Sequence, residues 1–297
     1  MLLRGVAGVT IVDLVAQTVQ SAGAACGLIG AGRPVAIGED LRRVDLVILA
    51  VPDDVLSALA GGSALDRAIG AGSVVLHCSG ALGAEVLAPL RRFGAVVASA
   101  HPVFSFSDPE GLAEAVFNNG PEAAGLSAAR SNSFTGAFCA LEGDPDGVAV
   151  ARAVFEGIGA RCFEISGEAK LLYHAATVIA SNYLTALVEC AAQSAEQAGV
   201  DRERAMMVLE PLVRGTVESI FSLGTAKALT GPIARGDHGL VAAQLTAIKA
   251  WNPERGELYR ALGREALWLA RSDRRASDEL LELVARSLEG EGNLKKA

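Results

Sequence analysis

A helical segment near the middle of the chain, GEAKLLYHAATVIASNYLTAL, carries a stripe of reactive side chains on an apolar background. At about 100° per residue, one narrow face of this helix holds Lys170, His174, Thr177, Ser181 and Thr185, with Asn182 beside it. A desolvated lysine and an ordinary histidine both titrate in a range that suits proton transfer, so Lys170 or His174 could protonate a carbonyl or imine. Ser181 and Asn182 could orient the substrate. The structural alternative is that these polar groups bond across a domain or subunit contact.

Further polar residues follow apolar runs that are typical of buried strands. His77, Ser79 and Gly80 lie in HCSGA, and His101 lies in SAHPVFSF, directly before a proline. The segment AVPDD adds Val51, Pro52 and Asp53 after another such run. Parallel α/β sheets bind ligands at the carboxyl ends of their strands, so these residues should face one crevice. The alternatives are that His101 caps a turn and that Asp53 mainly caps the next helix.

A dinucleotide site needs a strand, a glycine-rich turn and a full helix whose N-terminus meets the pyrophosphate. The glycines of Gly30-Ala31-Gly32 do not meet this need, because too few residues follow them before the next strand at Asp45. We interpret Ala25–Gly32 as a second strand with its exit turn. The glycine turn would then precede a helix over Thr10–Ala22.

That first turn would contain Gly5 and Gly8, in a pattern that lacks the first glycine of GxGxxG. The degenerate pattern and the very short strand before it indicate either a late start of the recorded chain or a decayed site. Arg33 would lie at the tip of the second strand, where arginine suits the 2′-phosphate of NADP and an acidic residue would suit NAD. A solvated surface arginine is the alternative.

The elements that must position these residues alternate between strands and helices in the first half. The expected strands are Asp45–Pro52, Ser73–Gly80, Ala95–Pro102, Ala137–Asp144 and Arg161–Ser166, and helices between them include Asp53–Ala60, Ala84–Phe93 and Asp146–Gly157. This alternation predicts βαβ units and a doubly wound, mostly parallel sheet. Later segments show only helical periodicity: Glu168–Gly199, Arg202–Leu223, Gly239–Ala250, Pro253–Arg271 and Ser277–Leu288. We therefore predict an α/β domain over 1–166 and an all-α domain over 167–297.

One turn interrupts the helical half. The segment GPIARGD forces a break, and Arg235 and Asp237 within it could bind an anionic substrate or pair across a dimer. A turn with an internal ion pair is the structural alternative. The C-terminal tail, EGEGNLKKA, is expected to fray.

The composition narrows the class of protein. The net charge of −8 argues against a nucleic-acid or anionic-membrane surface as the main partner. The five cysteines form no CxxC pair, which favours reduced thiols in a cytosolic protein over a zinc site or a disulfide framework. The histidines show no metal-ligand spacing, and no GxSxG elbow indicates a serine hydrolase. No run of about 18 or more uncharged apolar residues suggests a spanning helix.

Several motifs, in order, resemble one bacterial family of unassigned function. They are DLVILAVPDD, HCSGALGAEVL, HPVFSF, EGD, YHAATVIASNYLTAL and GPIARGD, and they extend from Asp45 to Ala270. This family has a Rossmann-like N-terminal domain and a helical C-terminal domain of the 6-phosphogluconate dehydrogenase type. It is similar to pyrroline-5-carboxylate reductase, to the deazaflavin-dependent NADP reductases and to the 6-phosphogluconate dehydrogenase superfamily.

The resemblance implies NADP binding in the first domain and homodimerisation through the helical one. It implies an active crevice between the domains, lined by His77, Ser79, His101, Tyr173, His174, Ser181 and Asn182. The family normally opens with a strand and GAGRxG, and this chain departs from that pattern at Gly5 and Gly8.

Two functions from different classes are consistent with the sequence. The first is a cytoplasmic, NADP(H)-dependent oxidoreductase that acts on a small carbonyl, imine or hydroxy substrate. Its nicotinamide would lie over the strand ends at His77–Gly80 and His101. The second is a non-catalytic nucleotide- or ligand-binding regulatory module that has lost its glycine loop. The degenerate N-terminal turn favours the second, and the Lys170–Asn182 stripe favours the first.

Overall fold

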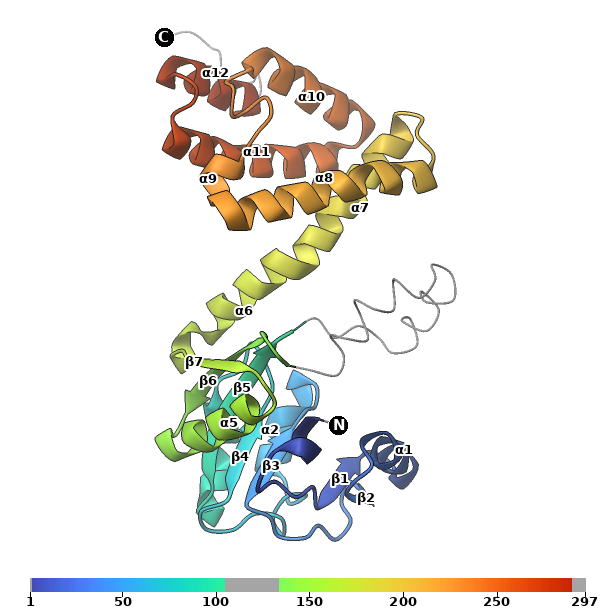
Figure 1. Cartoon of the computed structure of the whole chain (residues 1–297), viewed down its shortest axis with the longest axis vertical. Coiled ribbons are helices and arrows are strands. Elements are labelled where there is room, and N and C mark those ends of the chain that lie inside the picture. Colours follow the sequence, from blue (N-terminus) through green and yellow to red (C-terminus); the bar gives the residue numbers. More distant parts are fainter. Residues whose placement is uncertain (1, 105–133, 290–297) are drawn as a thin grey trace. The chain divides into compact units, whose positions relative to one another are not determined.

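The computed structural model describes residues 2–104 and 134–289 (Figure 1). The chain divides into two compact units, Met1–Ser181 and Asn182–Ala297. The all-α segment that we expect from residue 167 therefore begins inside the first unit. Two sequence-based expectations lie outside the described residues: the end of the HPVFSF motif, at Ser105 and Phe106, and the fraying of residues 290–297.

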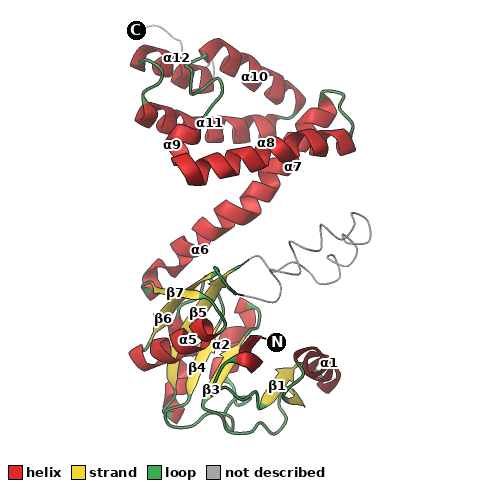
Figure 2. Ribbon diagram, in the orientation of Figure 1, coloured by secondary structure: helices red, strands yellow, loops and turns green. Residues whose placement is uncertain are grey.

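A five-stranded sheet forms the centre of the first unit (Figure 2). Its strands, in spatial order, are β3 (Leu46–Leu49), β4 (Val74–His77), β5 (Val96–Val103), β6 (Phe138–Gly143) and β7 (Arg161–Glu164). All neighbouring pairs are parallel except β5 and β6, which are antiparallel. The predicted mostly parallel sheet is confirmed, and four of its strands fall within runs expected from the sequence, while β5 extends one residue past its run, to Val103.

Helices cover both faces of this sheet, because alternate residues of buried strands point to opposite sides. One face packs Leu76, Ala98 and Leu141 against α5 (Pro145–Gly157). The other packs Val75 and Val97 against α2 (Asp53–Gly61) and the 3₁₀ helix η2 (Ala84–Phe93). Further along the strands, this second face also meets α6 (Lys170–Val178), which follows the short turn η3 (Gly167–Ala169).

The N-terminal region differs from the sequence-based prediction. After the 3₁₀ turn η1 (Leu2–Gly5), it forms β1 (Asp13–Ala16), α1 (Val19–Ile29) and β2 (Arg33–Ala36), with β1 and β2 paired in a separate parallel sheet. The predicted helix over Thr10–Ala22 and the predicted strand over Ala25–Gly32 are therefore wrong.

Local signals explain where α1 begins and ends. The hydroxyl of Thr18 accepts the Ser21 N–H at 3.1 Å and caps the first turn. Gly30 ends the helix in the left-handed region, at φ 73°, and its N–H donates to the Cys26 carbonyl at 2.7 Å. Gly30 is thus a helix cap, and the apolar residues before it are helical.

The second unit consists of helices. They are α7 (Leu184–Gln197), α8 (Arg202–Leu223), α9 (Thr225–Ala228), α10 (His238–Trp251), α11 (Pro253–Asp273) and α12 (Asp278–Glu289). Val241, Leu267, Leu281, Val284 and Leu288 form their buried core. The helical half is confirmed.

Asp237, which we considered as a substrate or dimer contact, caps α10 by accepting the Leu240 N–H at 3.1 Å. Its carboxylate thus satisfies a backbone group of its own chain. The role of Arg235 stays a prediction.

One helical stretch, Gly167–Gln197, has the length and mean hydropathy of a membrane span. It is interrupted in the middle by polar residues, among them His174, Ser181 and Asn182. A single stretch of this kind is weak evidence, because core helices of soluble proteins have the same composition.

Candidate active site

The sheet face beneath α6 presents three rows of side chains, which the strand register defines. The first row is His77, Ser99 and Glu142; the second is His101, Ala140 and Phe163; the third is Val103, Phe138 and Arg161. The rows change from polar and titratable to aromatic along the strands. Because the helix α6 lies on this face, its side chains meet these rows within the first unit.

Lys170 is the most buried charged side chain of this region, with 1% of its surface exposed. Its Nζ donates to the Ser79 carbonyl at 2.8 Å and to the Ser99 hydroxyl, and lies 3.9 Å from Glu142 Oε1. Burial lowers the pKa of Lys170 to about 8, although Glu142 opposes the shift. The ammonium can therefore release its proton close to neutral pH, as the sequence analysis anticipated for a desolvated lysine.

Two neighbours of Lys170 are also buried and titratable. The Glu142 carboxylate accepts the Ala84 N–H at 2.6 Å, and burial raises the pKa of Glu142. His77 accepts the Ser79 N–H on Nδ1 at 3.2 Å, so its Nε2 donates to the Gly83 carbonyl at 3.2 Å. Burial, and then the charge of Lys170, lower the pKa of His77 to about 4. His77 is consequently a neutral structural imidazole at pH 7.

His101 and His174 meet above Gly80. Their ring centroids are 5.6 Å apart, with the planes at 80°. A Cβ at Gly80 would lie 2.4 Å from His174 Nδ1 and 2.8 Å from His101 Nε2. Burial, and then the neighbouring His174 and Lys170, lower the pKa of His101 to about 4. Only glycine at position 80 lets both imidazoles approach the end of β4.

Tyr173 lies on the same side of α6, and its ring centroid is 5.9 Å from that of His101. The Tyr173 hydroxyl and His101 Nδ1 are both buried without a hydrogen-bond partner among the described residues. A buried polar atom without a partner is costly, so both atoms indicate a polar group that belongs to a ligand or to an ordered water.

A hydrogen bond links the ends of β3 and β4. The Ser79 hydroxyl donates to Asp53 Oδ2 at 2.9 Å and accepts the Leu82 N–H at 2.9 Å. Pro52, not Asp53, is the cap residue of α2, and Asp53 is its first helical residue. The expectation that Asp53 mainly caps the helix is therefore wrong, since its carboxylate fixes the loop that carries Gly80. Val51 and Pro52 lie at the same strand end, as expected.

Two of the predicted residues lie where the helix changes from α to π geometry. The stretch η4 (Ile179–Tyr183) is a π-helix, which contains Ser181 and Asn182. A π-turn holds more residues than an α-turn, so the stripe calculated for an unbroken α-helix does not continue past Val178. Asn182 opens the second unit, and the roles of Ser181 and Asn182 stay predictions.

The residues predicted to hold a dinucleotide phosphate do not form a glycine turn. Gly5 ends η1 and Gly8 lies in the loop before β1, so neither stands between a strand and a helix. Of the strand-to-helix turns that the structure describes, the one into α2 carries Asp53 and Asp54 in its first turn, which disfavours a phosphate. Gly5 and Gly8 therefore form no glycine turn, and their predicted role as a glycine loop is wrong.

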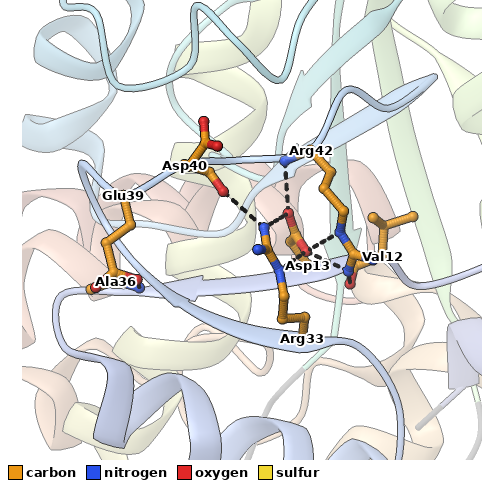
Figure 3. Close-up of polar contacts among 7 residues, drawn as sticks. All are labelled: Val12, Asp13, Arg33, Ala36, Glu39, Asp40 and Arg42. Atoms are coloured by element: carbon orange, nitrogen blue, oxygen red, sulfur yellow. Dashed lines mark hydrogen bonds and ion pairs between the residues drawn. The ribbon is translucent and has the colours of Figure 1, made fainter.

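Arg33 is committed to an ion pair (Figure 3). It opens β2, and its Nε donates to Asp13 Oδ1 at 2.9 Å, while Arg42 approaches the same carboxylate at 2.6 Å. The Arg33 guanidinium is the main reason that the pKa of Asp13 lies well below its usual range. The predicted place of Arg33 at a strand tip, facing the 2′-phosphate of NADP, is wrong because the arginine starts its strand and pairs with Asp13.

A cavity that the sequence did not predict lies at the aromatic end of the rows. It has a volume of about 380 Å³ and is lined by Val103, Phe138, Phe163, Tyr173 and Thr177. Within each strand, the period of two that sets Phe138 of β6 and Phe163 of β7 apart from the residues of the opposite face was visible in the sequence. The antiparallel register of β5 and β6, which brings Val103 beside Phe138, was not. In the ranges described, no group of three or more His, Cys, Asp or Glu side chains could hold a metal ion.

Comparisons with known proteins agree with this architecture. Residues 7–102 match a Rossmann-like domain, and residues 137–266 match a domain of unknown function, DUF2520. Among curated proteins, none matches the sequence.

Three solved structures illustrate the similarity. Protein TM1727 from Thermotoga maritima is 26% identical, with 88% of this chain and 91% of that chain covered and a TM-score of 0.65. A Bacteroides fragilis protein, BF3122, whose name proposes an NADP oxidoreductase, is 18% identical, with coverages of 91% and 90% and a TM-score of 0.63. The 1-pyrroline-5-carboxylate reductase of Streptococcus pyogenes is 12% identical, with coverages of 87% and 91% and a TM-score of 0.52. The resemblance inferred from the motifs is thus confirmed: a Rossmann-like domain matches residues 7–102, and DUF2520 matches residues 137–266, a range that includes β6 and β7 as well as helices of the second unit.

Proposed function

We propose that the protein is a dinucleotide-dependent oxidoreductase that acts on a small carbonyl, imine or hydroxy compound, with NADP(H) as the dinucleotide. The observation that carries the proposal is the buried Lys170, bonded to Ser79 and Ser99 beside two imidazoles at the end of β4. The names of two structural neighbours, an NADP oxidoreductase and a pyrroline-5-carboxylate reductase, support it.

The roles of the cluster follow from burial. His174 is only half-buried beside Gly80, so it is the group that gives a proton to the substrate or takes one from it. Lys170 is too buried to touch a substrate, and it acts as a positioning residue that holds the Ser79 carbonyl and the Ser99 hydroxyl. Its charge also favours the neutral form of His101, which leaves that ring able to accept a hydrogen bond.

A second candidate function is a non-catalytic nucleotide- or ligand-binding regulatory module. The observation that favours it is that neither Gly5 nor Gly8 stands between a strand and a helix. The two functions share the pocket and differ in the need for a dinucleotide.

We further propose a cytoplasmic homodimer that assembles through the helical unit. Several large apolar side chains of α8 are exposed, with Met207 at 69%, Leu212 at 64% and Phe221 at 87%. Exposed apolar side chains of this size are typical of a protein interface. The five free cysteines and the acidic net charge support a reducing compartment and a small-molecule substrate rather than nucleic acid.

The first test is calorimetric titration of the purified chain with NADPH and then with NADH. Micromolar binding of NADPH, with weaker binding of NADH, would support the enzyme and justify a screen of carbonyls and imines. If neither NADPH nor NADH bound, the oxidoreductase would be rejected, and the non-catalytic binding module would be the remaining candidate function. With a substrate in hand, His174→Ala should lower kcat/KM by about 10² to 10⁴, the usual contribution of general acid–base catalysis. His238→Ala, a change at a histidine on the second unit, is the matched control.

A further inference from the structure

The cavity beside the site is aromatic on three sides. The Phe163 ring stands edge-on to Tyr173 at 5.9 Å and edge-on to Phe138 at 6.2 Å, measured between ring centroids. Val103 and Thr177 complete the lining, and all five residues belong to the first unit. Aromatic walls at right angles to one another suit a flat, apolar group, which can present its face to one ring and its edge to the next.

A positive charge lies next to this cavity. Arg161 pairs with Phe138 across β6 and β7, and its guanidinium carbon is 5.9 Å from the centre of the Phe138 ring. Arg161 makes no ion pair within residues 2–104 and 134–289, whereas Arg152, on the α5 side of β7, pairs with Glu164 at 2.5 Å. A guanidinium without an acidic partner at the edge of an apolar cavity favours a carboxylate ligand, which it can bind through two parallel hydrogen bonds.

The other side of the cavity is apolar as well. Tyr173 lines it with its ring, while the Tyr173 hydroxyl is buried and does not reach the surface of the cavity. The neighbouring His101 does not line the cavity. Recognition of a ligand here therefore depends on the aromatic walls and on Arg161.

We infer that this cavity binds a small aromatic or similarly flat apolar carboxylic acid. The carboxylate lies at Arg161, and the apolar body lies against Phe138 and Phe163. The volume of about 380 Å³ is near the lower end of ligand pockets, which suits a single ring with its side chain. The inference rests on the proposed function, because the acid would be the substrate of that enzyme.

Binding of a non-reactive probe tests the inference without any turnover. The probe is phenylacetate, and its neutral counterpart is phenylacetamide, each titrated into the full chain and measured by ligand-observed NMR. The wild type should bind phenylacetate more tightly than the amide. Arg161→Gln should weaken phenylacetate about tenfold, the usual effect of losing one charge-assisted contact, and leave the amide unchanged. Arg161→Lys should recover part of the loss, because it keeps the charge but not the paired geometry.

Two controls separate the site from general effects. Arg67→Gln removes an exposed arginine that pairs with Asp40 and should leave binding of both probes unchanged. Phe163→Leu should weaken both probes alike, because it alters the shared apolar wall. Equal binding of phenylacetate by the wild type and Arg161→Gln, or no binding by the wild type, would overturn the inference. NADPH binding tests the proposed function separately. Binding of phenylacetate in this pattern without binding of NADPH would support the proposed cavity and reject the proposed oxidoreductase.

Discussion

Replacing Gly80 by alanine is the sharpest test of how the two imidazoles are held. Gly80 does not have a positive φ, so its backbone conformation accepts alanine. The added Cβ would lie 2.4 Å from His174 Nδ1 and 2.8 Å from His101 Nε2, where ordinary contacts are 3.4 to 4 Å. Each ring must therefore move by roughly 0.6 to 1 Å, the difference between these distances.

The size of the effect follows from that displacement. Overpacking of a tight site destabilises the folded protein by about 1 to 3 kcal/mol. The alanine offsets about 0.4 to 1 kcal/mol of this, because it lowers the conformational entropy of the unfolded chain. We therefore expect Gly80→Ala to lower the free energy of unfolding by roughly 1 to 2 kcal/mol. A misplacement of about 1 Å near reacting groups can cost about 10² in rate, so kcat/KM with an identified substrate should fall to that extent.

Urea unfolding gives the stability, and ¹⁵N-edited NMR of the imidazoles gives the position of the rings with no need for a substrate. Displacement toward water should raise the pKa of His101 from about 4 toward its ordinary value, since burial is the main cause of its lowering. Gly83→Ala is the matched control, because its Cβ would meet its nearest neighbours at 3.8 Å. If Gly80→Ala left the imidazole resonances, the pKa of His101 and the stability as they are in the wild type, the crowded geometry above Gly80 would be refuted.

Three further predictions concern charge and assembly. The pKa of Lys170 is about 8 in the folded protein and 10.5 ordinarily, so the unfolded chain binds the proton more tightly between these values. Stability should consequently rise by roughly 3 kcal/mol from pH 8 to pH 10.5, and Lys170→Met should abolish this rise in urea titrations at each pH. Asp13→Asn should cost about 1 to 3 kcal/mol at pH 7 by breaking two arginine pairs. Because the pKa of Asp13 is lowered by folding, that loss should shrink as the pH falls below about 4, and a constant loss would contradict the pairing. Leu212→Glu, at an exposed position of α8, should convert a dimer to monomers in sedimentation; an unchanged mass would exclude this position from the interface.

Continuous apolar runs explain why the central sheet could be predicted. Each run, such as Asp45–Pro52 or Ser73–Gly80, is continuously apolar and bounded by turn residues, so its strand shows in the local sequence. The N-terminal region lacked this clarity, since Leu14, Val15 and Ala16 fit a helix and a strand equally well. What decides for the strand is the pairing of Asp13 with Arg33 and Arg42, and these contacts are distant in sequence.

The parts of the candidate site that a single helix or strand positions could be predicted from the sequence. Lys170 and His174 share a helix face, so their proximity followed from spacing alone, and the strand-end positions of Ser79 and His101 followed from the sheet. The aromatic cavity needs the register of β5, β6 and β7, which no local pattern encodes. The same limit applies to Ser181, because the π-helical turn that offsets it from Lys170 has no signature in the residue spacing.

The π-helical segment Ile179–Tyr183 bears on how related sequences should be aligned. Such a segment accommodates one residue more than an α-helix, so a relative that lacks one residue here would keep an unbroken helix. All its later positions would then be turned by about 100° around the helix axis. A single-residue insertion or deletion at this place would therefore move the polar positions after Tyr183 to another side of the helix. Residues before Ile179 and after Tyr183 should be matched between relatives as two separate blocks.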